Sequence, residues 1–180
     1  RATALTDLPA EAAESASGRP VVIGAGRVGR LVCDVLSTEG HVALVIDRDA
    51  ELVARGRNEG RDIVFGDAQR PGILRKCGIE TAPIAVVTLH DATATEQVVT
   101  MLHRLRPDLP IIARARDAEH AVRLFSMGAT QVIPEAFETG LDLAGDALRR
   151  LGASPDRTSA LLDSRREAMM RLLRSEPAPR

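Results

Sequence analysis

Three glycines near the start of the sequence have the spacing of a turn that holds a phosphate group. Gly24, Gly26 and Gly29 form a Gly-x-Gly-x-x-Gly motif in the stretch RPVVIGAGRVGRLVCDVL. The motif follows a short apolar run and precedes a segment with helical periodicity, which is the setting in which it binds nucleotides. There the first glycine permits the tight turn, the second lets a phosphate approach the backbone, and the third allows close packing of helix on strand.

The residues after this turn supply the other groups that a nucleotide needs. Backbone N–H groups near Arg27 and Val28, at the start of the expected helix, would face a phosphate. Asp47 lies 18 positions after Gly29, at the end of the second expected strand. A carboxylate there accepts hydrogen bonds from a ribose diol and repels a 2′-phosphate, which favours NAD or an adenosine nucleotide over NADP. Arg48 either contacts the nucleotide, through adenine or a phosphate, or is a solvated loop charge.

A second acidic residue marks the end of the third expected strand. Asp67 and Ala68 belong to the segment FGDA, at the carboxyl edge of the sheet, where the binding crevice of such folds lies. Asp67 either contacts the adenine side of a ligand or caps the helix that follows. The pattern alone favours capping.

The rest of the sequence carries no recognisable catalytic motif. A Gly-x-Ser-x-Gly elbow and a Walker-type Gly-Lys-Ser/Thr are both missing, which leaves hydrolase and phosphotransferase activities without support. The segment ARARD places Arg114 and Arg116 on one face of a strand end, either as ligand or partner contacts or as solvated side chains beside a helix-capping Asp117. The four histidines are dispersed without metal-ligand spacing: His41, His90, His103 and His120.

Composition and charge restrict the class of partner. With 180 residues, the chain fits one domain with short tails. The formal net charge is −1, and three Phe with no Trp or Tyr are the only aromatic side chains, so neither an electrostatic field nor a stacking platform favours nucleic acid. Cys33 and Cys77 fall in apolar helical patterns, which is typical of core residues in a reducing compartment.

The glycine turn belongs to a regular alternation of strands and helices. Apolar runs such as VALVI and IAVVT are separated by segments with helical periodicity, which predicts parallel strands covered on both faces. We therefore expect a Rossmann-like α/β fold with a doubly wound, parallel, six-stranded sheet. The expected strands are 20–24, 42–47, 62–66, 83–88, 110–115 and 131–133. The expected helices are 27–39, 49–59, 70–77, 91–106, 117–127, 136–151 and 157–174.

The two ends of the chain differ from this alternation. Residues 1–18 are rich in Ala, Ser and Glu and are expected to form a linker. The Rossmann-type domain is expected at 19–152, followed by a C-terminal helical extension at 153–174 and a tail at 175–180. The helix near 136–151 carries an apolar stripe that must be buried against another element: Phe137, Leu141, Ala144, Leu148 and Leu151.

No apolar run reaches the roughly 18 residues of a membrane-spanning helix. We therefore expect this chain itself to be soluble. Its first residue is Arg rather than Met, which indicates a fragment or a processed chain of a longer parent.

Together these segments resemble the nucleotide-binding regulatory domain of potassium transport systems, known as the KTN, RCK or TrkA-N type. The resemblance is closest to the cytosolic domain of Kef-type potassium efflux antiporters and covers about residues 19–152. It is carried by VVIGAGRVGRLV, VIDRD, VFGDAQRPGIL, PIIARARD and MGATQVIPEAFETGLDLAGDALRRLG. It implies a domain without catalytic activity that dimerises through its C-terminal helices, binds an adenine nucleotide, often NAD(H) or AMP, and gates an attached membrane transporter.

The resemblance also assigns roles to individual residues. It implies phosphate contacts by Gly24, Gly26, Arg27 and Val28. It implies ribose contacts by Asp47 and Arg48, adenine contacts by Asp67 and Ala68, and a place near the crevice for Thr88. Glutathione-gated members have an Arg and an Asn where this sequence has Pro134 and Met169, which argues against glutathione as a ligand. A different anion site could be formed by Arg114, Arg116, Arg165 and Arg166.

These observations predict the regulatory domain of a potassium/proton antiporter or related potassium transporter, at the cytoplasmic face of the inner membrane. Its expected partners are a second copy of the chain and a membrane domain on the same or a separate chain. The alternative is a small NAD-dependent oxidoreductase or its cofactor-binding half. That enzyme would need a proton donor in the crevice, for which the sequence offers only Thr88 and His90.

Overall fold

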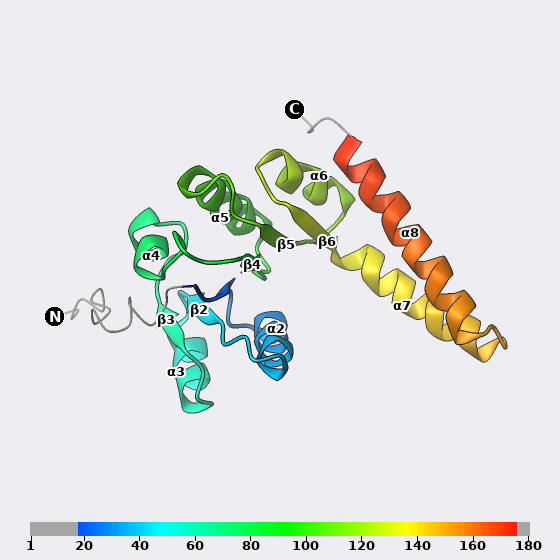
Figure 1. Cartoon of the computed structure of the whole chain (residues 1–180), viewed down its shortest axis with the longest axis horizontal. Coiled ribbons are helices and arrows are strands. Elements are labelled where there is room, and N and C mark those ends of the chain that lie inside the picture. The colour runs from blue at the N-terminus through cyan, green and yellow to red at the C-terminus, as the bar shows by residue number, and fades with distance from the viewer. Residues whose placement is uncertain (1–17, 176–180) are drawn as a thin grey trace.

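The computed structural model describes residues 18–175 and shows a parallel sheet flanked by helices (Figure 1). The strands lie in the order β3-β2-β1-β4-β5-β6, and each neighbouring pair is parallel. The order changes direction between β1 and β4, as in a doubly wound fold. The predicted Rossmann-like α/β fold with a six-stranded parallel sheet is confirmed. The strands are β1 (Val21–Ile23), β2 (Leu44–Asp47), β3 (Ile63–Phe65), β4 (Ala85–Val87), β5 (Ile111–Ala115) and β6 (Gln131–Pro134).

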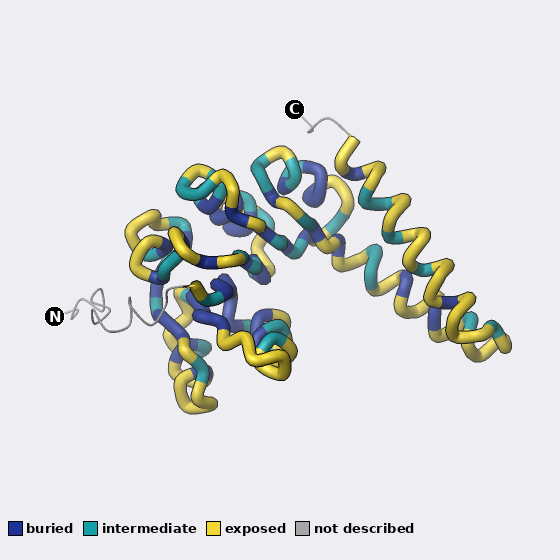
Figure 2. Tube along the Cα trace, viewed as in Figure 1, coloured by how far each residue is buried: buried dark blue, intermediate teal, exposed yellow. Residues whose placement is uncertain are grey.

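Helices cover both faces of the sheet. Side chains alternate along a strand, so Val21 and Ile23 join one apolar cluster while Val22 joins the other. The helices on the first face are α4 (Pro71–Lys76), α5 (Ala92–Leu105) and α6 (Ala118–Ser126). The helices on the second face are α2 (Arg27–Thr38) and α3 (Ala50–Asn58). Figure 2 shows that the strands are almost continuously buried, which explains why they read as unbroken apolar runs.

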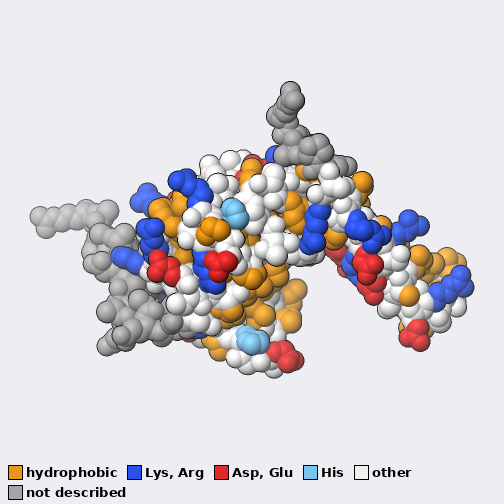
Figure 3. All heavy atoms as spheres, turned by 45° about the horizontal axis from the view of Figure 1, so that its top comes forward, with side chains coloured by type: hydrophobic (Ala, Val, Ile, Leu, Met, Phe, Trp, Pro, Cys, Tyr) orange, Lys and Arg blue, Asp and Glu red, His pale blue; other side chains and the backbone are white. Residues whose placement is uncertain are grey.

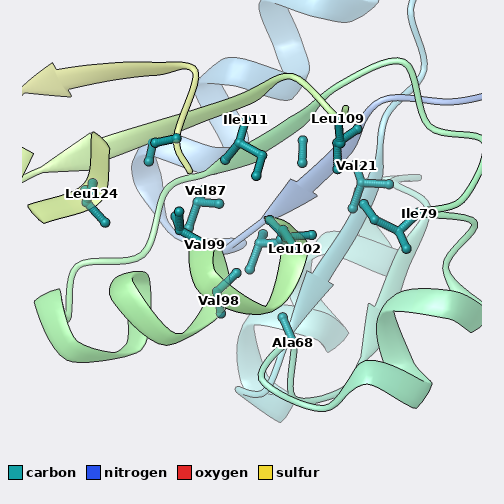
Figure 4. Packing of buried hydrophobic residues seen from close by; sticks show 14 of the residues in the cluster. Val21, Ala68, Ile79, Val87, Val98, Val99, Leu102, Leu109, Ile111 and Leu124 are labelled. Atoms are coloured by element: carbon teal, nitrogen blue, oxygen red, sulfur yellow. The ribbon is translucent and has the colours of Figure 1, made fainter. Parts of the chain in front are cut away.

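The core is built from aliphatic side chains. In the larger cluster, Val98, Val99 and Leu102 of α5 pack with Val87 and Ile111 of the central strands (Figure 4). All five side chains are at most 1% exposed. Branched aliphatic side chains thus fill the space between the layers, as the shortage of aromatic residues requires.

Two C-terminal helices form a hairpin that projects from the β6 end of the sheet (Figure 1). They are α7 (Glu135–Arg150) and α8 (Pro155–Ser175). α8 packs along α7 and then against α6. At that end Leu173 is buried, and Met169 and Met170 pack against the core cluster. The return of α8 therefore fixes the hairpin to the sheet domain.

The apolar stripe predicted on α7 is covered only in part, and by α8 of the same chain. Leu141 is buried, and a Cβ built on Gly145 would lie 2.9 Å from Leu162 Cδ1 of α8, so the two helices are in close contact. Leu151, the last residue of the stripe, is 84% exposed. Within one chain the stripe is therefore buried only in part, because periodicity identifies an apolar face but not what covers it.

Several sequence-based expectations concern the chain ends and the cysteines. Of the expected linker (1–18) and tail (175–180), all but the residues at positions 18 and 175 lie outside the described residues. Cys33 and Cys77 are buried free thiols, and burial raises the pKa of Cys77 to about 12. Between residues 18 and 175, no helix is long and apolar enough to span a bilayer.

A buried histidine links α6 to the end of β5. His120 is 2% exposed, and its Nδ1 accepts a hydrogen bond from the backbone N–H of Arg116 at 3.1 Å. Nε2 therefore carries the proton of the neutral ring. The pKa of His120 is lowered chiefly because burial disfavours the charged ring, with Arg123 adding to this effect and Glu96 opposing it.

This histidine makes stability depend on pH. Because its pKa in the folded chain lies below the unfolded value, the unfolded state binds more protons as the solution is acidified. The contribution of neutral His120 to the free energy of unfolding is fully present above a pH of about 6.5, and it is lost as the pH falls through the folded-state pKa. We expect His120→Asn, which keeps an acceptor for the Arg116 N–H but cannot titrate, to lose less stability than the wild type between pH 7.5 and 5.5. Urea denaturation at the two pH values measures this, and equal losses would contradict it.

Candidate functional site

The residue that follows β4 supports the glycine turn by hydrogen bonds. Gly24 has φ of +109°, which an L-residue rarely adopts, and its carbonyl accepts a hydrogen bond from Thr88 Oγ1 at 3.1 Å. The same hydroxyl lies 3.1 Å from the carbonyl oxygen of Ile23. A Cβ on Gly29 would lie 1.8 Å from the Gly24 carbonyl oxygen, so helix α2 touches the turn directly. Thr88 therefore positions the turn with a buried hydroxyl.

The first turn of α2 is free to receive an anion. Gly26 is the N-cap of α2, no side chain caps the helix, and its first turn has no acidic residue. In contrast, Asp49, Asp91 and Asp117 cap α3, α5 and α6 with their carboxylates. A Cβ on Gly26 would meet nothing within 4 Å, so there is open space beside the turn at this residue. Unpaired N–H groups and the helix dipole together favour a phosphate at this place.

Asp47 joins the glycine turn to the end of β2. Its Oδ2 accepts a hydrogen bond from the backbone N–H of Ala25 at 2.6 Å, and its Oδ1 accepts one from the N–H of Asp49 at 2.8 Å. A carboxylate offers about four lone-pair sites, so two remain for a ribose diol. Sequence reasoning predicted that Asp47 binds the ligand but not that it supports the turn, because the loop contacts depend on the folded geometry.

The two hydrogen bonds that Asp47 accepts make this residue important for stability. In Asp47→Ala the N–H of Ala25, a residue only 5% exposed, loses its acceptor. We expect the free energy of unfolding to fall by about 2 kcal/mol, and by about half of that in Asp47→Asn, which keeps one acceptor oxygen. Chemical denaturation measures both values. Unchanged stability in Asp47→Ala would show that the carboxylate does not hold the turn.

A pocket of about 190 Å³ opens beside the turn, at the point where the strand order changes direction. It brings together four residues predicted from the sequence, Asp47, Arg48, Asp67 and Ala68. The glycines, Arg27 and Val28 lie in the adjoining turn and helix, outside the pocket lining. His90, which the sequence offered only as a proton donor for the oxidoreductase alternative, also lines the pocket, and sequence reasoning missed three further lining residues: Gln69, Leu89 and Asp91. Apart from their place after β3 and β4, nothing in the sequence identified them.

Asp67 supports the loop after β3. Helix α4 begins at Pro71 with Arg70 as N-cap and no side-chain cap, so the prediction that Asp67 caps this helix is wrong. Instead, Asp67 Oδ1 accepts a hydrogen bond from the backbone N–H of Gln69 at 3.0 Å. The carboxylate lines the pocket and shapes its rim.

Three of the four arginines considered as a separate anion site are paired with carboxylates in the structure. Arg114 pairs with Glu135 at 2.5 Å, and Arg166 pairs with Glu138 at 2.9 Å. Arg116 pairs at 3.0 Å with Asp117, whose pKa is lowered first by the hydrogen bond from the His120 N–H and then by Arg116. Asp117 caps α6, as the sequence suggested. Each of these three charges is therefore paired with its own carboxylate, and the three pairs do not share a partner.

The turn, Asp47 and the pocket together offer the groups that binding of a nucleotide needs. The turn offers N–H donors for a phosphate, Asp47 offers acceptors for a ribose, and the pocket offers apolar walls from Ile23, Ile46 and Leu89. Within residues 18–175, no group of three or more His, Cys, Asp or Glu side chains is placed to hold a metal ion.

The amino-acid sequence is similar to one known domain family and to several curated proteins. The profile of a family described as the TrkA-N domain matches residues 20–135. The glutathione-regulated potassium-efflux system protein KefC of Cronobacter sakazakii is 32% identical over 134 residues, which are 74% of this chain and 22% of that protein. The chain spans about a quarter or less of the length of the curated relatives that it matches.

Two solved structures are also similar. The Kef C-terminal domain of Shewanella denitrificans, in an AMP-bound form, has a TM-score of 0.74 and 25% identity, covering 87% of this chain and 96% of that one. The TrkA-N domain of the inner membrane protein ybaL of Escherichia coli has a TM-score of 0.65 and 27% identity, covering 71% and 96% of the two chains.

Proposed function

This chain belongs to the TrkA-N domain family, and on that premise we propose that it is the nucleotide-sensing regulatory domain of a potassium/proton antiporter or a related potassium transporter. The relatives support this because they are potassium efflux proteins about four times as long as the matched segment or longer. In this proposal the remainder of the parent protein lies in the membrane, and this domain lies at its cytoplasmic face. It acts by binding, without a catalytic step of its own.

The ligand that we propose is an adenine nucleotide, with AMP or NAD(H) as the leading candidates. The supporting observation is the start of α2, which no side chain caps. The space beside Gly26 is open, and Asp47 and the pocket lie next to the turn. The phosphates would lie against the turn from Gly24 to Gly29, bound by the N–H groups near Arg27 and Val28. The AMP-bound form of the similar Kef domain is consistent with this choice.

The remaining contacts follow from the position of the pocket. Asp47 and Arg48 would hold the ribose, and Asp67 and Ala68 would lie beside the adenine. Thr88 is buried below the turn and would act by fixing it. Because Asp47 repels a 2′-phosphate, NADP is expected to bind more weakly than NAD.

We further propose that the domain works as a homodimer. Several large apolar side chains of the hairpin remain exposed, with Leu143 at 68% and Leu151 at 84%. Figure 3 also shows hydrophobic surface on the projecting hairpin, among side chains of both charges. A second copy would cover this surface. Ligand binding that favours one dimer arrangement over another would supply the coupling free energy for gating.

Titration calorimetry of the chain with AMP, ADP, ATP, NAD, NADH and NADPH tests the ligand class. Micromolar binding of at least one of these, without oxidation of NADH, would support a sensor. Turnover of NADH with a small carbonyl substrate would support the oxidoreductase alternative, for which His90 in the pocket would be the nearest proton donor. Light scattering tests the dimer, and a mass near 19.3 kDa at micromolar concentration would contradict it.

A further inference from the structure

A short chain of polar contacts connects the pocket with the first residue of α7. His90 lines the pocket, and its Nδ1 lies 3.4 Å from Nη2 of Arg114. Arg114 donates from Nε and Nη2 to Oε2 of Glu135, at 2.9 and 2.5 Å. Glu135 is the first residue of α7. Three side chains from three separate elements thus link the candidate ligand site to the projecting hairpin.

The backbone pairing brings these residues together. Arg114 of β5 pairs with Ile133 of β6, and β6 continues directly into α7 at Glu135 (Figure 1). The carboxyl ends of both strands therefore lie at the edge of the sheet where the pocket opens. The Arg114 side chain is 18% exposed and the Glu135 side chain 51%, so the cation is half-buried while its carboxylate partner stays open to solvent and can be exchanged for another anion.

The start of α7 follows β6 without a loop, and ion pairs add to its anchoring. Its N-cap is Pro134, and no side chain caps the helix. The first turn has two acidic residues: Glu135 pairs with Arg114, and Glu138 pairs with Arg166 of α8 at 2.9 Å. The second pair lies within the hairpin. The pair of Arg114 with Glu135 therefore ties the hairpin to the sheet domain.

We propose that Arg114 couples occupancy of the pocket to the position of α7, an inference that rests on the nucleotide-binding function proposed above. Nη2 of the guanidinium contacts both Glu135 and His90, and His90 lines the pocket. His90 follows two residues after Thr88, which contacts the glycine turn where we place the phosphate. The negative charge of a nucleotide bound at the turn and the pocket then competes with Glu135 for this one cation. Binding then weakens the tie between β5 and α7, and by reciprocity a weakened tie favours binding.

This competition predicts effects of opposite sign on AMP affinity. Glu135→Gln removes the competing charge and is expected to tighten AMP binding about fivefold. Arg114→Met removes the cation and is expected to weaken binding by a similar factor. Arg116→Met is the matched control, because Arg116 lies two positions away and pairs with the helix-capping Asp117. The AMP affinity of the Arg116→Met variant should stay within about twofold of the wild-type value.

Hydrogen exchange supplies a second readout. If Arg114 only stabilised the fold, AMP would not change amide exchange at the start of α7. In the wild type and in Arg116→Met, saturating AMP is expected to speed amide exchange in residues 138–141, whose N–H groups are the first in α7 with intrahelical acceptors. In Arg114→Met and Glu135→Gln, where the tie is already broken, exchange there should be fast without AMP and should not respond to it. Arg114→Lys keeps the charge but not the forked geometry, and is expected to retain a reduced response, so it substitutes for Arg114→Met if that variant does not fold.

The outcomes separate this inference from the proposed function. A wild type that binds none of the nucleotides overturns the proposed function and this inference with it. A wild type that binds AMP, while both variants weaken binding or leave it unchanged, overturns the coupling role of Arg114 alone. Opposite shifts in affinity, together with loss of the exchange response, support it.

Discussion

Replacement of Gly29 by Ala is expected to lower the free energy of unfolding by about 3 kcal/mol. The added Cβ would lie 1.8 Å from the carbonyl oxygen of Gly24, 2.9 Å from its carbonyl carbon and 2.9 Å from Thr88 Oγ1. Two of these atoms are backbone, so a side-chain rotation cannot relieve the clash. Helix α2 must move away from the turn, which breaks the packing that Thr88 maintains from below.

Chemical denaturation measures this effect, with Gly72→Ala as the matched control. Gly72 lies within α4, and a Cβ there would meet nothing within 4 Å. Alanine is the better helix former, so the control should be as stable as the wild type or more stable by up to about 1 kcal/mol. A Gly29→Ala variant as stable as its control would show that helix and turn are not in the contact described.

Replacement of Gly26 by Ala is expected to separate binding from folding. The backbone of Gly26 has φ of −68° and ψ of −170°, which alanine adopts without strain, and a Cβ would meet nothing within 4 Å. Alanine is a poorer N-cap than glycine but restricts the unfolded chain, and these two effects oppose each other. We expect the free energy of unfolding to change by no more than about 0.5 kcal/mol.

Nucleotide binding should respond in a different way. The new methyl group would occupy the open space beside Gly26, at the N-cap of α2 against which we place the phosphate. Affinity for AMP is expected to fall at least about tenfold, or about 1.4 kcal/mol. Calorimetric titration compares the variant with the wild type. Equal affinities in two equally stable proteins would place the phosphate elsewhere.

The sheet and its helices could be predicted because their signals are local. Apolar strand runs alternate with amphipathic segments, and the observed strand ends lie within one or two residues of the predicted ones. The glycine turn was recognisable because its spacing reflects close approaches that only glycine allows, as the contact of Gly29 with Gly24 illustrates.

The finer details of the site depend on contacts between distant residues. Asp47 was predicted from its distance to the glycines, yet its hydrogen bond to Ala25 joins residues 22 positions apart. The link from His90 through Arg114 to Glu135 joins three elements and leaves no periodic trace in the sequence. Such contacts follow from the strand order and register, which local patterns do not specify.

The hairpin shows a related limit. The apolar stripe on α7 was recognised, but its periodicity could not reveal that α8 of the same chain covers Leu141 and approaches Gly145. The weaker periodicity of α8, interrupted by Arg165 and Arg166, gave no sign of this pairing. In the structure Arg166 turns to Glu138 of α7, so an interruption in the apolar pattern is in fact a contact of the hairpin.

The central claim is that the glycine turn and the adjoining pocket bind one adenine nucleotide. The most direct test is a titration of the isotope-labelled chain with AMP, followed by the backbone amide signals in nuclear magnetic resonance spectra. We predict that the largest shifts occur at Gly26, Arg27 and Val28, followed by Asp47 and Ala68. An absence of shifts, or shifts confined to α7 and α8, would contradict the account.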